Sequence, residues 1–385
     1  MKITALETLC LSRLHERERQ WFTSTSRTIK ADCAIVVIHT DEGVQGIGEA
    51  SAYGWPLIIR RWVDRLAPEL VGKDPQDPSI VPHPNGLSRS HDAAVAGIDC
   101  ALWDLRGKIA GKRTCELLTD EPLDRIRLYA SSGCRYDWRD DPKQLIEEAL
   151  EYIDMGYTAM KFRIGTHWEW DGVTVERFLG LVHELVETVD GRMELMLEGN
   201  TRFTEEQATR IAKELDTLGF TWFEEPMPRE PVEGYVRLCA TTDTPISGGE
   251  GFSTLEQFMP YLERGAYDIV QPDAGMCGIT EAMRIGQEAY RHGVDLVPHS
   301  WHNGLMCMAN SHLVAALPNP RFVELCMIQG PLQWAILKEK PTIEDGWLVL
   351  PDGPGLGVEL AEDLEERFPY IEGHYAIQVQ REKAI

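Results

Sequence analysis

Eight short apolar runs alternate with amphipathic helical stretches over residues 126–326, and this repeat strongly limits what the chain can fold into. The runs are Ile126–Ser132, Ala159–Ile164, Glu194–Gly199, Thr221–Glu225, Pro245–Gly249, Tyr267–Gln271, Asp295–Pro298 and Phe322–Cys326. Strands that alternate with helices form a parallel sheet, which is either closed into a (β/α)8 barrel or open and doubly wound. An open sheet usually carries a glycine-rich phosphate loop after its first strand, and the sequence contains no such loop. We therefore predict a (β/α)8 barrel.

The stretches between these runs carry helix start and stop signals. Thr204–Gln207 and Ser253–Glu256 match the capping box, in which a hydroxyl and a Glu or Gln three residues later bind the first free amides of a helix. Four glycines are placed where a left-handed residue ends a helix: Gly156, Gly219, Gly265 and Gly293.

Residues 1–125 follow a different pattern, which predicts a separate α+β capping domain. A hairpin is expected from Ala34–His39 and Val44–Gly48, and helices are expected over 57–71 and 90–111. The tail from residue 331 lacks the barrel pattern, and we expect it to fold back onto the capping domain. The predicted domains are therefore 1–125, 126–330 and 331–385.

The charge balance and the cysteines exclude several classes of function. The chain has 62 acidic and 38 basic residues, a net charge of −24, and no basic run, so nucleic acids and anionic membranes are poor partners. Nine scattered cysteines without a C-x-x-C pair argue against a disulfide framework or a zinc site. The sequence has no apolar stretch of membrane-spanning length and no signal-peptide pattern at Met1, so we expect a cytoplasmic protein.

Polar residues stand at the carboxyl ends of the predicted strands from the second to the eighth. From Arg163 on they are spaced by 35, 26, 26, 23, 26 and 25 residues, each close to one β/α unit. The strand ends of a barrel surround one mouth, so all these side chains are expected to meet there. They are Lys161, Arg163, Glu198, Glu224, Glu250, Asp273, His299 and Glu324. A single Glu or His at a strand end is usually a rim, capping or packing residue, but five carboxylates in one cavity would repel each other unless a cation neutralised some of them.

Three of these carboxylates point to a magnesium site. Glu198, Glu224 and Glu250 end three consecutive strands, and hard oxygen ligands without cysteine suit Mg²⁺, with Mn²⁺ possible, rather than zinc. We expect one ion per subunit.

The next two strands supply an acid–base pair. Asp273 beside His299 would fix the imidazole tautomer and raise its basicity, so His299 is a candidate general base. Lys161 and Arg163, two apart on one strand, would supply positive charge for an anionic substrate. A base, a divalent metal and these cations are what removal of a proton α to a carboxylate requires.

At these residues the chain resembles the enolase superfamily, mandelate racemase subgroup, over nearly its whole length. The resemblance rests on Ala93–Lys108, Phe223–Pro226, Gly248–Glu250, Gln271–Ala274, Pro298–His299 and Pro354–Leu360. It implies a modified (β/α)8 barrel whose mouth is closed by the N-terminal domain, through loops near Trp21–Thr25 and Ser51–Trp55. Candidate substrate contacts are Trp21, Tyr53, Asn200, Trp301 and His302, although Trp21 and His302 could equally serve in packing or in a loop. A homo-oligomer is expected from the same resemblance.

Two departures from the family pattern bear on the reaction. Glu198 stands where the family usually has Asp, and its longer arm can still reach a metal. Arg163 stands where racemases of the family have a second lysine, and a guanidinium cannot act as a base. His299 is then the only base unless Lys161 serves.

This pattern favours a sugar-acid dehydratase that makes a 2-keto-3-deoxy acid from an aldonate or aldarate. Glu324 would donate a hydrogen bond to the substrate carboxylate if its pKa is raised. A racemase, epimerase or cycloisomerase on the same scaffold is the nearest alternative. A barrel glycosidase and a non-catalytic binding protein are weaker alternatives, because the cation pair and all three ligands are present.

Overall fold

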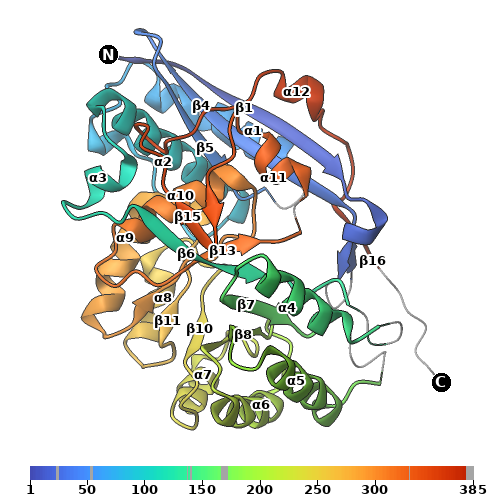
Figure 1. Ribbon diagram of the computed structural model, residues 1–385. Coiled ribbons are helices and arrows are strands. Elements are labelled where there is room, and N and C mark those ends of the chain that lie inside the picture. The colour runs from blue at the N-terminus through green and yellow to red at the C-terminus, as the bar shows by residue number, and fades with distance from the viewer. Residues whose placement is uncertain are drawn as a thin grey trace.

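The computed structural model describes residues 1–22, 26–52, 55–136, 138, 141–165, 172–328 and 330–378. Within these residues a barrel occupies the centre of the chain, and an antiparallel sheet with two long helices lies beside it (Figure 1).

The barrel contains all eight predicted strands. They are β6 (Arg125–Ser131), β7 (Ala159–Arg163), β8 (Glu194–Glu198), β9 (Trp222–Glu224), β10 (Ile246–Gly248), β11 (Ile269–Val270), β12 (Asp295–Leu296) and β13 (Val323–Cys326). Neighbours follow chain order from β6 to β12, and β13 pairs in parallel with the other side of β6. Placing the last strand beside the first is typical of a barrel and not of a doubly wound sheet, so the predicted fold class is confirmed.

An aromatic layer fills the barrel interior. Tyr129, Trp222 and Phe322 pack edge to face, with ring centroids 5.4 to 6.1 Å apart. Ala159, Met196, Ile269 and Val297 complete this buried cluster. Met196 and Trp222 precede Glu198 and Glu224 by two residues, so the same side of each strand supplies the apolar layer and then the polar mouth.

Helices follow the barrel strands and pack their apolar faces against them. They are α4 (Gln144–Asp154), α5 (Val175–Val189), α6 (Glu205–Leu218), α7 (Val232–Cys239), α8 (Leu255–Leu262), α9 (Ala274–Arg291) and α10 (Gly304–Ala315). The capping box at Thr204 is confirmed, since Gln207 N donates to the Thr204 hydroxyl and Thr204 N to Gln207 Oε1. The four predicted glycine terminators all have a positive φ.

The second capping box lies one residue later than the predicted Ser253–Glu256. The first residue of α8 is Leu255, and its N-cap is Thr254, whose amide donates to Gln257 Oε1 at 3.2 Å. The hydroxyl of Ser253 instead donates to Asp92 Oδ2 at 2.6 Å. A long-range partner on another element therefore decides which hydroxyl caps the helix.

The N-terminal unit is a three-stranded antiparallel sheet covered by helices. Its strands β1 (Ile3–Leu14), β4 (Lys30–Thr40) and β5 (Gln45–Ala50) lie in the order β1-β4-β5, next to α1 (Pro56–Leu70) and α2 (Arg89–Ala110). The predicted hairpin and both helices are confirmed, whereas β1 was not predicted. Glycine is required at position 48, because a Cβ there would lie 2.3 Å from the Gly97 carbonyl oxygen of α2.

The tail divides between the barrel and the N-terminal unit. After α11 (Pro331–Ala335), the hairpin of β14 (Ile343–Glu344) and β15 (Trp347–Val349) adds antiparallel to β6 of the barrel. The chain then runs beside β1 through α12 (Leu364–Arg367), as Figure 1 shows in red against blue. Its last described strand, β16 (Ala376–Gln378), pairs with β3 (Ser26–Thr28), which pairs with β2 (Trp21–Phe22). The short helix α3 (Thr114–Leu118) joins the N-terminal unit to the barrel, and the domain boundaries at 125 and 330 stay a prediction.

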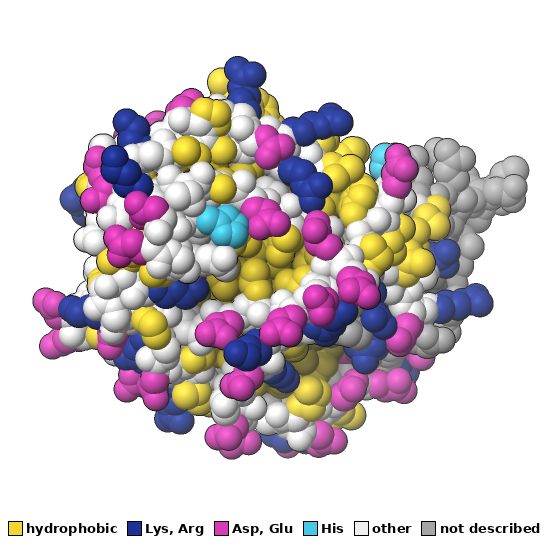
Figure 2. All heavy atoms as spheres, turned by 90° about the horizontal axis from the view of Figure 1, so that it is seen from above, with side chains coloured by type: hydrophobic (Ala, Val, Ile, Leu, Met, Phe, Trp, Pro, Cys, Tyr) yellow, Lys and Arg dark blue, Asp and Glu magenta, His cyan; other side chains and the backbone are white. Residues whose placement is uncertain are grey.

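Acidic and basic side chains are interspersed over the face seen in Figure 2, so the net negative charge does not form a single-sign patch there. Among the described residues, no helix combines the length and the apolar character that crossing a bilayer demands.

Candidate active site

Three carboxylates converge at the mouth of the barrel. Glu198 and Glu224 are the last residues of β8 and β9, and Glu250 follows β10 by two residues. One oxygen from each lies within 4.8 Å of the others. Burial first, and then the charge of Glu224, raises the pKa of Glu198 well above its usual range. Such mutual repulsion is relieved when a divalent cation shares the charge, so this donor set fits a metal with oxygen ligands.

Lys161 lies beneath this group as a buried ammonium ion. Its Nζ contacts Glu224 Oε1, lies 3.2 Å from Glu324 Oε1 and 3.7 Å from Glu198 Oε2. Burial opposes its charge, but Glu224 and then Glu324 raise the pKa of Lys161 well above its ordinary value. These carboxylates favour the ammonium form of Lys161.

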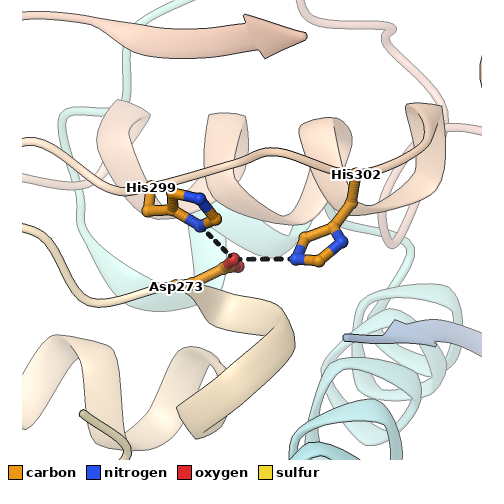
Figure 3. A group of neighbouring side chains, drawn as sticks. All are labelled: Asp273, His299 and His302. Carbon is orange, nitrogen blue, oxygen red and sulfur yellow. Dashed lines mark hydrogen bonds and ion pairs between the residues drawn. The ribbon is translucent and has the colours of Figure 1, made fainter. Parts of the chain in front are cut away.

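Asp273 lies between two imidazoles (Figure 3). Its Oδ2 is 2.7 Å from Nδ1 of His299 and 3.0 Å from Nε2 of His302. Its Oδ1 accepts from Gly275 N at 2.8 Å, which makes Asp273 the N-cap of α9. These contacts hold the pKa of Asp273 below its usual range despite burial, so the carboxylate is ionised. It therefore fixes Nδ1 of His299 as a donor and leaves Nε2 to accept a proton.

The Nε2 atom of His299 faces the carboxylate group. It lies 3.3 Å from Glu250 Oε2. Burial lowers the pKa of His299, but the charges of Glu250 and Glu324 and the bond to Asp273 outweigh it and raise that pKa to about 9. The share due to Glu250 falls when a cation takes up that charge. The imidazole is then neutral at a lower pH and available as a base.

Arg163 is held between indole rings. Its guanidinium lies 4.4 Å from the ring centroid of Trp301 and 5.8 Å from that of Trp21. Its Nε is buried and has no hydrogen-bond partner among the described residues. Nearby acidic groups, against the effect of burial, raise the already high pKa of Arg163, so it supplies a fixed positive charge.

The pKa of Glu324 is lowered and not raised, contrary to the condition for its expected role as a hydrogen-bond donor. Although burial opposes the charge, Lys161 and then His299 lower its pKa, and its Oε2 accepts from Ser300 N at 2.6 Å. The raised pKa on which its role as a hydrogen-bond donor depended is therefore not found. An ionised Glu324 is an acceptor that holds Lys161 in place.

A cavity of about 690 Å³ lies between the barrel mouth and the N-terminal unit. The barrel contributes Arg163, Asn200, Glu250, His299 and Trp301, and the N-terminal unit contributes Trp21 and Ser51 among others. Of the candidate substrate contacts, Asn200, Trp21 and Trp301 line this cavity. His302 is buried behind Asp273 and is not among the lining residues, and Tyr53 lies outside the described residues.

Four polar residues of the site were not predicted. Arg202 lines the cavity two residues after Asn200, but Asn200 and Thr201 have positive φ, so the alternation of a strand does not apply and spacing alone does not indicate it. Glu225 binds Arg229, whose Nη2 lies 4.0 Å from Glu250 Oε1. The position of Glu225 next to the predicted ligand Glu224 could have indicated it. Glu49 of β5 accepts from Met306 N of α10 at 2.9 Å, and no local pattern indicates this contact.

Two protein-family profiles cover most of the chain. Residues 10–119 match the mandelate racemase / muconate lactonizing enzyme N-terminal domain, and residues 144–364 match the enolase C-terminal domain-like family.

Individual relatives match over most of their length. A D-galactarolactone cycloisomerase of Agrobacterium fabrum is 30% identical, with 96% of this chain and 99% of the relative aligned. An arabinonate dehydratase of Saccharolobus solfataricus is also 30% identical, over 86% of this chain and 89% of its own. The crystal structure of the 3,6-anhydro-D-galactonate cycloisomerase from Zobellia galactanivorans superposes with a TM-score of 0.82 at 29% identity, covering 96% of this chain and 99% of that one.

Proposed function

Because the chain belongs to the enolase superfamily, in its mandelate racemase subgroup, we propose that it is a Mg²⁺-dependent dehydratase of a sugar acid. It would remove the proton α to the carboxylate of an aldonate or aldarate and eliminate the 3-hydroxyl. The products would be water and a 2-keto-3-deoxy acid.

One observation carries the choice of elimination. Among the described residues of the mouth, the geometry favours His299 as the base, because Asp273 binds its Nδ1 and leaves Nε2 facing the carboxylate group. The pairing of Lys161 with Glu224 and Glu324 favours its ammonium form, and the guanidinium of Arg163 cannot act as a base. A racemase needs a base on each face of the carbon, whereas an elimination needs one group that first accepts a proton and then returns it.

The roles of the side chains follow from this choice. Nε2 of His299 takes the α-proton while Asp273 holds Nδ1. As the imidazolium, His299 then gives that proton to the departing 3-hydroxyl, which leaves as water. The resulting enol becomes the 2-keto acid by taking a proton at C3 and releasing the proton of its 2-hydroxyl.

Charge stabilisation rests on fixed groups around the mouth. Mg²⁺ held by Glu198, Glu224 and Glu250 would bind the substrate carboxylate and stabilise the charge of the enediolate. Lys161 and Arg163 add positive charge that needs no rearrangement during the reaction. Asn200, Trp21 and Trp301 would orient the polyol chain.

A cycloisomerase is the second candidate, supported by the end-to-end match to the Agrobacterium fabrum protein. The same base would remove the same kind of proton, but the departing oxygen would belong to a ring and stay attached to the product. No water would then be released.

The test is a screen of aldonic acids, aldaric acids and their lactones with Mg²⁺, read as 2-keto acid formed. We expect a linear acid to react, and we expect both EDTA and His299→Asn to reduce the rate by at least about 100-fold. Reaction of lactones alone would select the cycloisomerase. Activity that survives either EDTA or His299→Asn would contradict the proposed mechanism.

A further inference from the structure

The cavity carries more positive charge than one substrate carboxylate requires. Its charged lining residues are three arginines, Arg89, Arg163 and Arg202, and one carboxylate, Glu250. In the proposed function Glu250 serves the metal, and Lys161 and Arg163 serve the reacting end of the substrate. The positive charges of Arg89, at the start of α2, and of Arg202, next to the barrel mouth, are then not accounted for.

Arg202 is placed by a loop that is fixed in an unusual conformation. Asn200 and Thr201, which follow the metal-site residue Glu198, have φ of 47° and 60°. A β-branched residue such as Thr201 is rarely found in this left-handed region, and it persists there only where its surroundings hold it. Thr201 N donates to Glu225 O at 2.7 Å, and Phe203 N donates to Pro226 O at 3.0 Å. The loop is thus bound to the neighbouring strand end on both sides of Arg202.

The guanidinium of Arg202 has few protein partners. Its Nη1 donates to the Gly165 carbonyl oxygen at 3.2 Å. None of the ion pairs between described residues includes it, although a guanidinium offers five N–H donors. Burial and the nearby charge of Arg163 lower the pKa of Arg202 to about 10. Two neighbouring cations that line one cavity are stabilised when an anion binds between or beside them.

We propose that Arg202 binds a second carboxylate at the far end of the substrate, so that the enzyme acts on a diacid, an aldarate or its lactone, in preference to a monoacid. The inference rests on the proposed function, which places the reacting carboxylate at the metal. Arg–carboxylate pairs can be bidentate, so this contact would also fix the orientation of the sugar acid relative to His299.

The probes are two matched pairs of acids, galactarate with galactonate and glucarate with gluconate. The members of each pair differ only at C6, where a carboxylate replaces a hydroxymethyl group. Binding is measured calorimetrically with Mg²⁺ on the His299→Asn protein, which would hold a substrate without converting it. Turnover to 2-keto acid is measured on the protein with His299 intact.

Arg202→Gln removes the charge, and Arg202→Lys keeps it without the planar fork. Arg210→Gln is the matched control, because Arg210 lies on α6 and pairs with Glu176 outside the cavity. We expect at least one diacid to bind more tightly than its monoacid partner. Arg202→Gln should reduce that preference by about 10- to 100-fold, Arg202→Lys should reduce it less, and Arg210→Gln should leave it unchanged.

Three results would overturn the subsite: monoacids that bind as tightly as diacids, an equal effect of Arg202→Gln on both, or binding of none of the four acids. Dehydration of monoacids with no effect of Arg202→Gln would refute the subsite and leave the proposed function standing. Diacid binding that depends on Arg202 without any keto acid formed would support the subsite and refute the dehydratase.

Discussion

At the scale of single residues, Asp273 connects the chemistry of the site to its structure. One oxygen caps α9 and the other orients His299 and His302. Asp273→Asn should keep the cap, because asparagine is an equally good N-cap, and should remove the charge that fixes the tautomer of His299. We expect kcat to fall by about 100- to 10,000-fold with little change in KM.

The pH profile gives an independent readout of the same variant. The negative charge of Asp273 raises the pKa of His299, so its loss should move the acidic limb of kcat/KM to lower pH. Asp273→Ala, which also lacks the cap, should in addition lose about 1 kcal/mol of unfolding free energy. An unchanged pH profile in Asp273→Asn would contradict the role assigned to this carboxylate.

The residues at the strand ends could be predicted because barrel geometry alone brings them together. Glu198, Glu224 and Glu250 needed only regular spacing and the rule that strand ends share one mouth. Arg202 could not be predicted in the same way, because its direction depends on two left-handed residues in a loop. The ionisation of Glu324 depends on Lys161 at 3.2 Å, a distance that spacing does not give.

At the scale of elements, the first turn of α10 is completed by a strand of the other unit. Glu49 of β5 accepts from Met306 N and from Asn303 Nδ2, both at 2.9 Å, in a fully buried position. Glu49→Ala would leave these donors without partners. We expect the free energy of unfolding to fall by about 2–4 kcal/mol, measured by urea denaturation.

Glu7→Ala is the control for this prediction. Glu7 is an exposed carboxylate on β1 that pairs with His39 at 3.1 Å. Its removal should change the free energy of unfolding by less than about 0.5 kcal/mol. Equal effects of the two substitutions would show that Glu49 does not join the units.

Elements with a local apolar pattern could be predicted from the sequence, whereas elements that depend on a distant partner could not. The eight barrel strands and the helices expected over 57–71 and 90–111 carry local apolar patterns, and the structure confirms them. The strands β2, β3 and β16 have two or three residues each and exist because each pairs with another short strand. Pairing between residues 28 and 376 leaves no local signal in either segment.

At the scale of the whole molecule, stability should depend on a buried neutral histidine. His312 of α10 has no exposed surface, and its Nδ1 accepts from Cys115 N of α3 at 3.3 Å. Burial lowers its pKa from 6.5 to about 4. Above pH 6.5 neither state is protonated, whereas between pH 6.5 and 4 only the unfolded chain takes up the proton. Stability is therefore lost as the pH falls, by about 3 kcal/mol in total.

Urea denaturation at pH 7 and at pH 4.5 measures this loss. His312→Asn keeps an acceptor for the Cys115 amide and cannot titrate. The variant should therefore lose less unfolding free energy than the parent between the two pH values, by up to about 3 kcal/mol. If both proteins lose the same amount, another group must account for the acid sensitivity.

The pairing of β16 with β3 also bears on the order in which the parts of the site are synthesised. The last barrel strand ends at residue 326, so every barrel strand and every carboxylate of the mouth precedes residues 376–378 in the chain. The strand beside Trp21, which covers Arg163, gains its outer neighbour only when residues 376–378 have left the ribosome. The residues of the barrel mouth are therefore synthesised before the segment that borders the strand beside Trp21.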